Sequence, residues 1–116
     1  MAVSMKRIYA AFYENFSGRA PVREWLLSLD KADRQIIGED IATVEFGWPV
    51  GMPVCRPLGH RLWEVRSSLP GNRTARVLFS IAGDRMLILH GFIKKTQKTP
   101  PADLALARKR LQEIDE

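Results

Sequence analysis

Hydrophobic residues in the first half of the chain recur with two periods, which predict one strand and then two helices. Residues 6 to 13 mix aromatic and branched residues with polar ones in partial alternation, which is typical of a strand. Pro21 stands where the first turn of a helix would begin, and Asp30 and Gly47 mark the start and end of a second helix. Each helix has one apolar face, formed by Val22, Trp25, Leu26 and Leu29 in the first and by Ile36, Ile37, Ile41 and Val44 in the second. We expect the two helices to form a hairpin over a sheet.

The pattern in the second half predicts a loop and then three strands. Residues 48 to 60 hold three prolines and two glycines, which indicates a loop. Residues 62 to 67 and 73 to 81 alternate apolar and polar side chains, and a turn follows each segment. Residues 86 to 93 are almost wholly apolar, which predicts a strand in the interior of the sheet.

A last helix is predicted after Thr99, because two successive prolines end the preceding strand there. Its apolar face consists of Leu104, Ala107, Leu111 and Ile114. The predicted order is β-α-α-β-β-β-α with an antiparallel meander, so the fold class is α+β. With 116 residues and no internal repeat, the chain is expected to form one domain over residues 1–116.

Composition narrows the class of protein. No apolar run approaches the roughly 18 residues that a membrane span needs, and the first residues lack the pattern of a signal peptide. Cys55 is the only cysteine, which excludes an intrachain disulfide and a four-cysteine zinc site. We interpret it as a small core or loop residue. Two histidines are too few for a convincing metal site, and neither a glycine-rich phosphate loop nor a nucleophile elbow is present. We expect a cytoplasmic protein without metal, cofactor or membrane partner.

Charge is distributed unevenly along the chain, whose formal net charge is +5. Residues 56 to 98 hold nine basic and two acidic residues, a net charge of +7, whereas the remainder holds nine basic and eleven acidic residues, a net charge of −2. A mildly acidic frame therefore carries a strongly basic segment. Such a segment favours a polyanionic partner, with nucleic acid the first candidate, although a solvated basic face has the same composition.

The candidate site follows from the period of a strand. Residues two apart share a face, so His90, Phe92 and Lys94 are expected to lie together where the last strand ends. Arg66 and Arg76 occupy the neighbouring strands at positions where burial would favour an apolar residue. The prediction is one concave basic surface with an aromatic ring among the cations. Phosphates require cations and an unstacked base requires an aromatic or guanidinium plane, so this surface favours nucleic acid.

Each of these residues also has a structural interpretation. Arg66 would form a surface ion pair with Glu64 or another neighbour, His90 would be a core histidine, and Phe92 would belong to the core. The three tryptophans are assigned to packing. Lys98 precedes the last helix, where a positive charge is slightly unfavourable to the helix dipole, which suggests another use for it.

Four segments together resemble one known family. RPLGHRLWEVR, RTARVLFSI, PVREWLLSL and above all LILHGFIKKTQKTP are similar to segments of the RelE/ParE toxin superfamily, and in particular of its phage-derived, HigB-like branch. The resemblance covers nearly the whole chain. It implies a small curved antiparallel sheet with two helices packed against it, which agrees with the predicted α+β fold.

The resemblance also implies a function and partners. It implies a toxin of a type II toxin–antitoxin system that cleaves messenger RNA without metal, usually on the translating ribosome, and that a cognate helix-turn-helix antitoxin neutralises. Arg66 and Arg76 match the strand arginines of the family and would stabilise charge, while Lys94 and Lys95 would bind phosphate or transfer protons. The further RNA-binding residues that we expect are Arg61, Arg73, His90, Phe92 and Lys98.

The chain departs from several relatives in one respect. They carry a tyrosine, or an aspartate and a histidine, near the C-terminus for proton transfer, whereas this chain runs through TQKTPP into a helix. The general acid and base therefore stay open, with His90 and the lysines as candidates. Two other functions also stay open, namely a ParE-like toxin that poisons DNA gyrase and a non-catalytic RNA- or ribosome-binding module.

Overall fold

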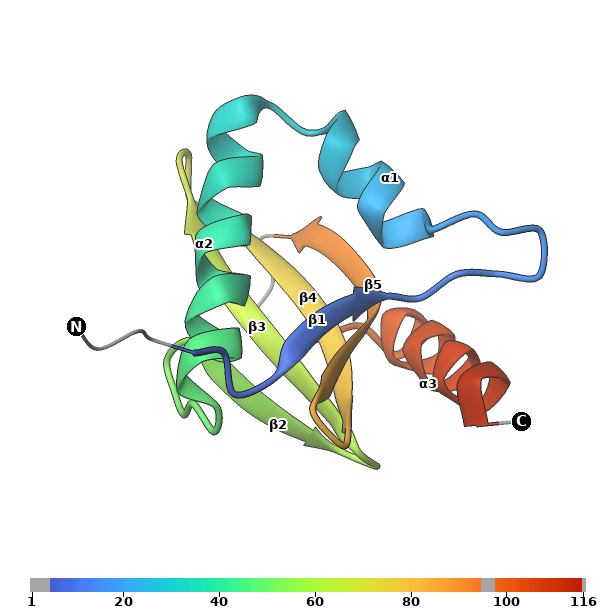
Figure 1. Cartoon of the computed structure of the whole chain (residues 1–116). Helices are drawn as coiled ribbons and strands as arrows, with labels where there is room; N and C mark the ends of the chain where they lie inside the picture. Colours follow the sequence, from blue (N-terminus) through green and yellow to red (C-terminus); the bar gives the residue numbers. More distant parts are fainter. Residues whose placement is uncertain (1–4, 95–97, 116) are drawn as a thin grey trace.

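The protein folds around a five-stranded sheet flanked by three helices (Figure 1). The structure, a computed structural model, describes residues 5–94 and 98–115. In chain order, the elements are β1 (Tyr9–Phe12), α1 (Pro21–Ser28), α2 (Lys31–Gly47), β2 (Cys55–Gly59), β3 (Leu62–Leu69), β4 (Arg73–Ala82), β5 (Arg85–Lys94) and α3 (Pro101–Asp115). The α+β class and the three helices predicted from periodicity are confirmed.

The sheet has the order β1-β5-β4-β3-β2 and is mixed. β1 runs parallel to β5, whereas the other neighbours are antiparallel. The expectation of a fully antiparallel meander was wrong for β1 alone. β5 lies between β1 and β4, which confirms its predicted interior position.

The strand β2 was missed because Pro57 and two glycines made its segment resemble a loop. Pro57 is tolerated because β2 is the edge strand, where a missing N–H on the outer side leaves no ladder bond unmade. At the N-terminus, the predicted strand is shorter than expected. The backbone N–H groups of Arg7 and Ile8 donate to the carbonyl oxygen of Glu45 at the end of α2 instead of to a strand.

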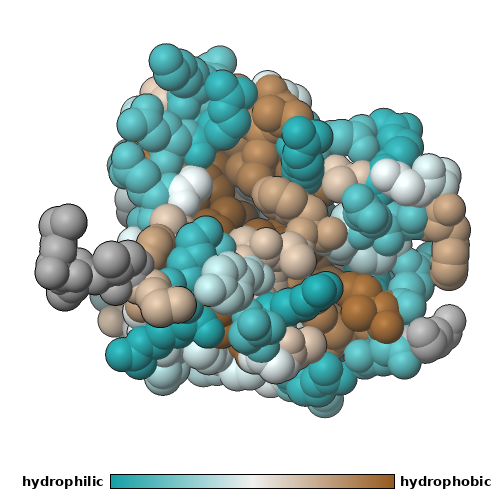
Figure 2. Space-filling view, viewed as in Figure 1, coloured by the Kyte–Doolittle hydropathy of each residue, from teal (hydrophilic) through white to brown (hydrophobic). Residues whose placement is uncertain are grey.

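The two faces of the sheet hold separate hydrophobic cores. α1 and α2 cover one face, where Val65, Val77 and Phe79 point. α3 covers part of the other face and packs on Leu62 and Leu78. The alternation predicted in β3 and β4 therefore sorts side chains between two cores, as Figure 1 shows by the helices on either side. Figure 2 shows hydrophobic residues gathered between α1 and α2, while the outer side of α2 is hydrophilic.

A bulge in β5 brings an extra apolar residue into the core under α3. Leu78 pairs with His90 and Phe79 pairs with Ile88, so Leu89 has no opposite residue in β4. Leu89 is fully buried in the same core as Leu78. The bulge shifts the in–out alternation of β5 by one residue. Apolar residues from both faces of the strand therefore appear as one continuous apolar run in the sequence.

The face under α1 and α2 is closed by aromatic rings. Trp48, Trp63 and Phe79 form an edge-to-face and stacked cluster with ring centroids 5.4 to 6.2 Å apart. Trp25 of α1 lies so close to β5 that a Cβ added to Gly91 would be 2.4 Å from its ring. The predicted packing role of the tryptophans is confirmed.

An ion pair fixes α2 to the start of β4. Both terminal nitrogens of the Arg73 guanidinium donate to the Asp33 carboxylate, at 2.8 and 3.0 Å. Arg73 therefore faces the helices, away from the surface on which sequence analysis placed it. The hydrogen bonds from Arg73 hold the pKa of the buried Asp33 carboxyl below its ordinary value of 3.8.

The Asp33–Arg73 pair should make stability depend on pH. We expect Asp33→Asn to lower the Tm near neutral pH, since it removes the charged acceptor of two hydrogen bonds. A carboxyl whose pKa folding lowers contributes its full stabilisation above the unfolded value, and this is lost as the pH falls through the folded value. Thermal unfolding measured from neutral to acidic pH should therefore show the Tm of Asp33→Asn converging with that of the wild type. Asp84→Asn, in the exposed β4–β5 turn, is the control, and a gap that persists in acid would contradict the assignment.

Candidate functional site

The candidate site contains a cross-strand row of directly opposite residues on β3, β4 and β5, on the sheet face that α3 partly covers. Arg66 of β3 lies directly opposite Arg76 of β4, which lies directly opposite Phe92 of β5. Directly opposite residues project from the same face. Two residues away from Phe92 on either side, Lys94 pairs with Thr74 and His90 pairs with Leu78. The register therefore places Arg66, Arg76, His90, Phe92 and Lys94 on one face.

Arg76 is enclosed in this face. Its side chain is 1% exposed, and its Nη1 donates to both carboxylate oxygens of Glu64 at 3.1 and 3.3 Å. Glu64 has no exposed surface and also accepts a 2.6 Å hydrogen bond from the Thr99 hydroxyl, just before α3. Sequence analysis expected Arg76 at an accessible basic surface, whereas the structure makes it part of a buried polar network that joins β3, β4 and the segment before α3.

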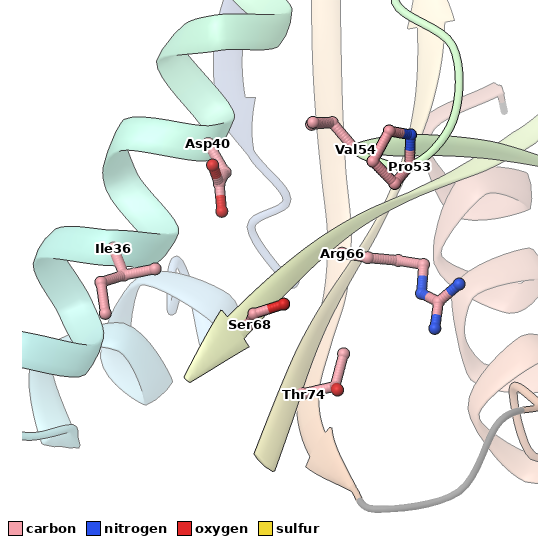
Figure 3. Close-up of a pocket in the computed structure, with 7 residues that line it drawn as sticks. All are labelled: Ile36, Asp40, Pro53, Val54, Arg66, Ser68 and Thr74. Carbon is pink, nitrogen blue, oxygen red and sulfur yellow. The ribbon is translucent and has the colours of Figure 1, made fainter. Parts of the chain in front are cut away.

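Arg66 is the accessible strand arginine. It is half-buried, and its guanidinium has no acidic partner within residues 5–94 and 98–115. Figure 3 shows its side chain pointing away from α2. The surface ion pair between Arg66 and Glu64 that sequence analysis considered is absent, because Glu64 binds Arg76 instead. Arg66 therefore presents a charge that the described part of the chain leaves uncompensated.

Two of the candidate lysines are exposed in the described part of the chain. Lys94 is exposed at the end of β5, and Lys98 is exposed shortly before α3. Lys95, which the resemblance assigns to catalysis, lies outside the described residues. Lys94 and Arg66 give this face positive charge, as the basic sequence segment suggested.

His90 forms a hydrogen-bonded pair with an acid on α3. Its Nε2 is 2.6 Å from Oδ1 of Asp103, and the two side chains are 15% and 18% exposed. The Phe92 ring lies 5.4 Å from the His90 ring and is itself 9% exposed. Phe92 thus contributes to the core under α3 and borders the histidine, which agrees with the structural interpretation of both residues.

Two arginines of the predicted RNA-binding set lie elsewhere. Arg61, in the β2–β3 turn, forms a 2.9 Å ion pair with Asp115 at the end of α3. Arg73 binds Asp33 on the opposite side of the sheet. The structure therefore does not bring Arg61 and Arg73 into the group around Arg66.

The remaining candidate chemistry is limited. Within the described ranges, no three His, Cys, Asp or Glu residues are placed to hold a metal ion. Cys55 is 1% exposed, and its burial raises the pKa of the thiol to about 11. This confirms its interpretation as a small core residue, since a thiol that stays protonated is a poor nucleophile.

The sequence pattern did not predict the two acids that contact Arg76 and His90, namely Glu64 and Asp103. A glutamate between apolar neighbours in a strand, as in LWEVR, is a signal for a buried partner, and here the partner is Arg76. Asp103 lacked a signal, because thirteen residues separate it from His90 and an acid in the first turn of a helix is common.

Fold and site define the class of protein. The chain has a small α+β fold of the RelE-like kind, with a cationic group on one sheet face. The sequence profile described as Phage derived protein Gp49-like matches residues 24–112. The chain therefore belongs to this phage-derived family, which comprises RelE- and HigB-like toxin proteins of toxin–antitoxin systems. Comparison with individually curated proteins gives no match. No helix in the described part of the chain is long and apolar enough to cross a membrane.

Removing the charge of Glu64 should destabilise the whole fold. In Glu64→Gln, Arg76 would keep its buried charge without a carboxylate, a change that typically costs about 3–5 kcal/mol. We expect urea unfolding to show a loss of this size with the m-value unchanged.

Ser68→Ala, an exposed position on the same strand, is the control and should unfold as the wild type does. The double variant Glu64→Gln/Arg76→Met should recover much of the loss, because it no longer buries the arginine charge. A Glu64→Gln protein as stable as the wild type would show that the pair does not support the fold.

Proposed function

We propose that the protein is the toxin of a type II toxin–antitoxin system and that it cleaves messenger RNA, chiefly on the translating ribosome. The observation that carries this proposal is the Arg66 guanidinium without an acidic partner in the described chain, on the same sheet face as the exposed Lys94 two strands away. Membership of the Gp49-like family supports the toxin class. A cytoplasmic location and a helix-turn-helix antitoxin belong to the same proposal.

Arg66 and Lys94 are proposed to hold the phosphate that is cleaved. Both lie on the face of the cross-strand row, and both carry charges that a phosphate oxygen would neutralise. Lys95 and Lys98 match basic positions of the family motif and are proposed to extend phosphate binding along the RNA. Arg61 and Arg73 have no role in the proposed cleavage site, since each is engaged in an ion pair outside it.

The proposed reaction is attack of a ribose 2′-hydroxyl on the adjacent phosphate, which expels the 5′-oxygen of the next nucleotide. Negative charge grows on the phosphate oxygens in the transition state, and a fixed cation there stabilises it. Arg66 is proposed to be that cation. Arg76 is proposed to act as a positioning residue, because its burial and its pair with Glu64 keep it from the substrate while fixing the strand that faces Arg66.

His90 is proposed to donate the proton that the leaving 5′-oxygen needs. Asp103 accepts from one ring nitrogen at 2.6 Å, which fixes the ring orientation and leaves the other nitrogen for the RNA. His90 lies on the same face, diagonal to Arg76 in the strand register. Phe92, beside His90, is proposed to provide an edge against which a base packs.

The function is tested by translation and RNA cleavage together. We expect the purified protein to arrest cell-free translation and to produce new RNA ends that carry a 5′-hydroxyl. Arg66→Ala should lower single-turnover cleavage on saturated ribosomes by about 10²-fold, the scale for loss of one preorganised charge-stabilising group.

Arg23→Ala, an exposed arginine on α1, is the matched control and should cleave as the wild type does. Arrest without new RNA ends would point to a ribosome-binding module. Intact translation with inhibited gyrase supercoiling would identify a gyrase poison and refute the proposal.

The proposed role of His90 as a general acid can be tested separately from its role in packing. His90→Gln should slow cleavage of ordinary RNA by about 10²-fold or more, the usual contribution of a general acid. An RNA with sulfur in place of the leaving 5′-oxygen at the mapped cut needs no proton, because a thiolate leaves unaided. This substrate should be cleaved at nearly equal rates by His90→Gln and the wild type. An equal slowing of both substrates would show that His90 is structural.

A further inference from the structure

A hollow of about 460 Å³ opens beside Arg66, where β2 stops pairing with β3 (Figure 3). Its volume lies within the range of pockets that hold small organic groups. One wall is apolar and consists of Ile36 on α2 with Pro53 and Val54 from the loop before β2. Arg66 is part of both the lining of the hollow and the candidate site.

The edge of β3 contributes backbone hydrogen-bonding groups to this hollow. The last pair between β2 and β3 joins Cys55 to Val65, and the Arg66 N–H then donates to the Val54 oxygen at 2.8 Å. Backbone groups of a strand face the same side at every second residue. Those of Ser68 therefore face the same edge as those of Arg66, and no strand of the described chain pairs with them there.

Asp40 supplies the only acid among the side chains that line the hollow. Its half-buried carboxylate forms no ion pair or side-chain hydrogen bond with any described residue. Figure 3 shows Asp40 projecting from α2 toward β3, while Arg66 extends to the other side of the strand. A carboxylate repels phosphate and accepts hydrogen bonds from amino groups. The wall at Asp40 thus suits a group that carries N–H donors.

These features together favour a nucleobase. We propose that the hollow binds a base with an exocyclic amino group, in the nucleotide next to the phosphate that Arg66 holds, and that it disfavours uracil. The amino group would donate to Asp40, the base edge would meet the Ser68 backbone, and the base face would lie on Ile36 and Val54. Uracil alone among the four bases has no exocyclic amino group, and its carbonyl oxygens would face the carboxylate. This inference rests on the proposed RNA cleavage and adds its sequence preference.

An extended peptide fits the same edge less well. The open part of β3 runs only from residue 66 to residue 69, whereas a strand usually spans five or six residues. A bound peptide would also place backbone carbonyl oxygens near the Asp40 carboxylate, and an ionised carboxylate can only accept hydrogen bonds.

The experiment maps cleavage by the wild type in RNAs whose codons carry each base in turn around the cut. We expect wild-type cleavage to be at least about tenfold slower when uracil occupies one fixed neighbouring position, the scale of one base-reading contact. Asp40→Asn should lose most of this discrimination, because an amide both donates and accepts. Glu39→Gln, the exposed neighbour on α2, is the matched control and should keep it.

Equal cleavage with uracil at every position, or an unchanged preference in Asp40→Asn, would overturn the base pocket while leaving the nuclease intact. If the wild type cleaves no RNA, the proposed function fails, and equilibrium binding of oligocytidylate and oligouridylate then decides the pocket. Preference of the wild type for oligocytidylate, lost in Asp40→Asn, would uphold it, and equal binding would overturn it. If Asp40→Asn weakens only binding of the antitoxin, the hollow is a protein-docking site and the inference is wrong.

Discussion

The buried ion pair between Glu64 and Arg76 is the constraint on which the arrangement of the sheet depends. Two charges without contact to water are expensive to bury, and they persist only where their geometry is fixed and their remaining hydrogen-bonding capacity is used. Glu64 meets this condition by binding Arg76 from one side and Thr99 from the other. Because these three residues come from β3, β4 and the segment before α3, the pair fixes where the last helix can begin.

This network gives different environments to two arginines, Arg66 and Arg76, whose sequence contexts are alike. Arg66 and Arg76 lie directly opposite each other, and both follow a strand pattern that would be apolar in an ordinary core. Arg76 is neutralised inside the protein, whereas Arg66 keeps a charge that no acid in the described part of the chain offsets. The buried pair also lowers the electrostatic cost of placing Arg66 nearby, since Glu64 offsets the charge of Arg76 at short range. The proposed polyanion site thus lies on a sheet face where only part of the positive charge reaches the surface.

Much of the fold could be predicted because it depends on local periodicity. The apolar stripes of three helices and the alternation of β3 and β4 are encoded within a few residues, and a strand pattern alone puts His90, Phe92 and Lys94 on one face. The parallel pairing of β1 with β5 could not be predicted, since it depends on how the chain returns across the sheet. The same limit applies to the site. Whether Arg61, Arg73 or Arg76 forms an ion pair depends on acids 12 to 54 residues away, and no local pattern identifies which residues pair.

The contact between Gly91 and Trp25 has a consequence for how the segment HGFIKK is interpreted. A glycine is required at position 91 because the indole ring of Trp25 on α1 occupies the space that any side chain would need. This part of the motif therefore reflects packing and does not indicate a catalytic or binding role. Substitutions at positions 25 and 91 are therefore expected to occur together. A homologous chain with a larger residue at position 91 would need a smaller one at position 25, and α1 would then lie closer to or farther from β5. Sequence divergence in the first helix and in the last strand is thereby linked, although sixty-five residues and most of the sheet lie between them in the chain.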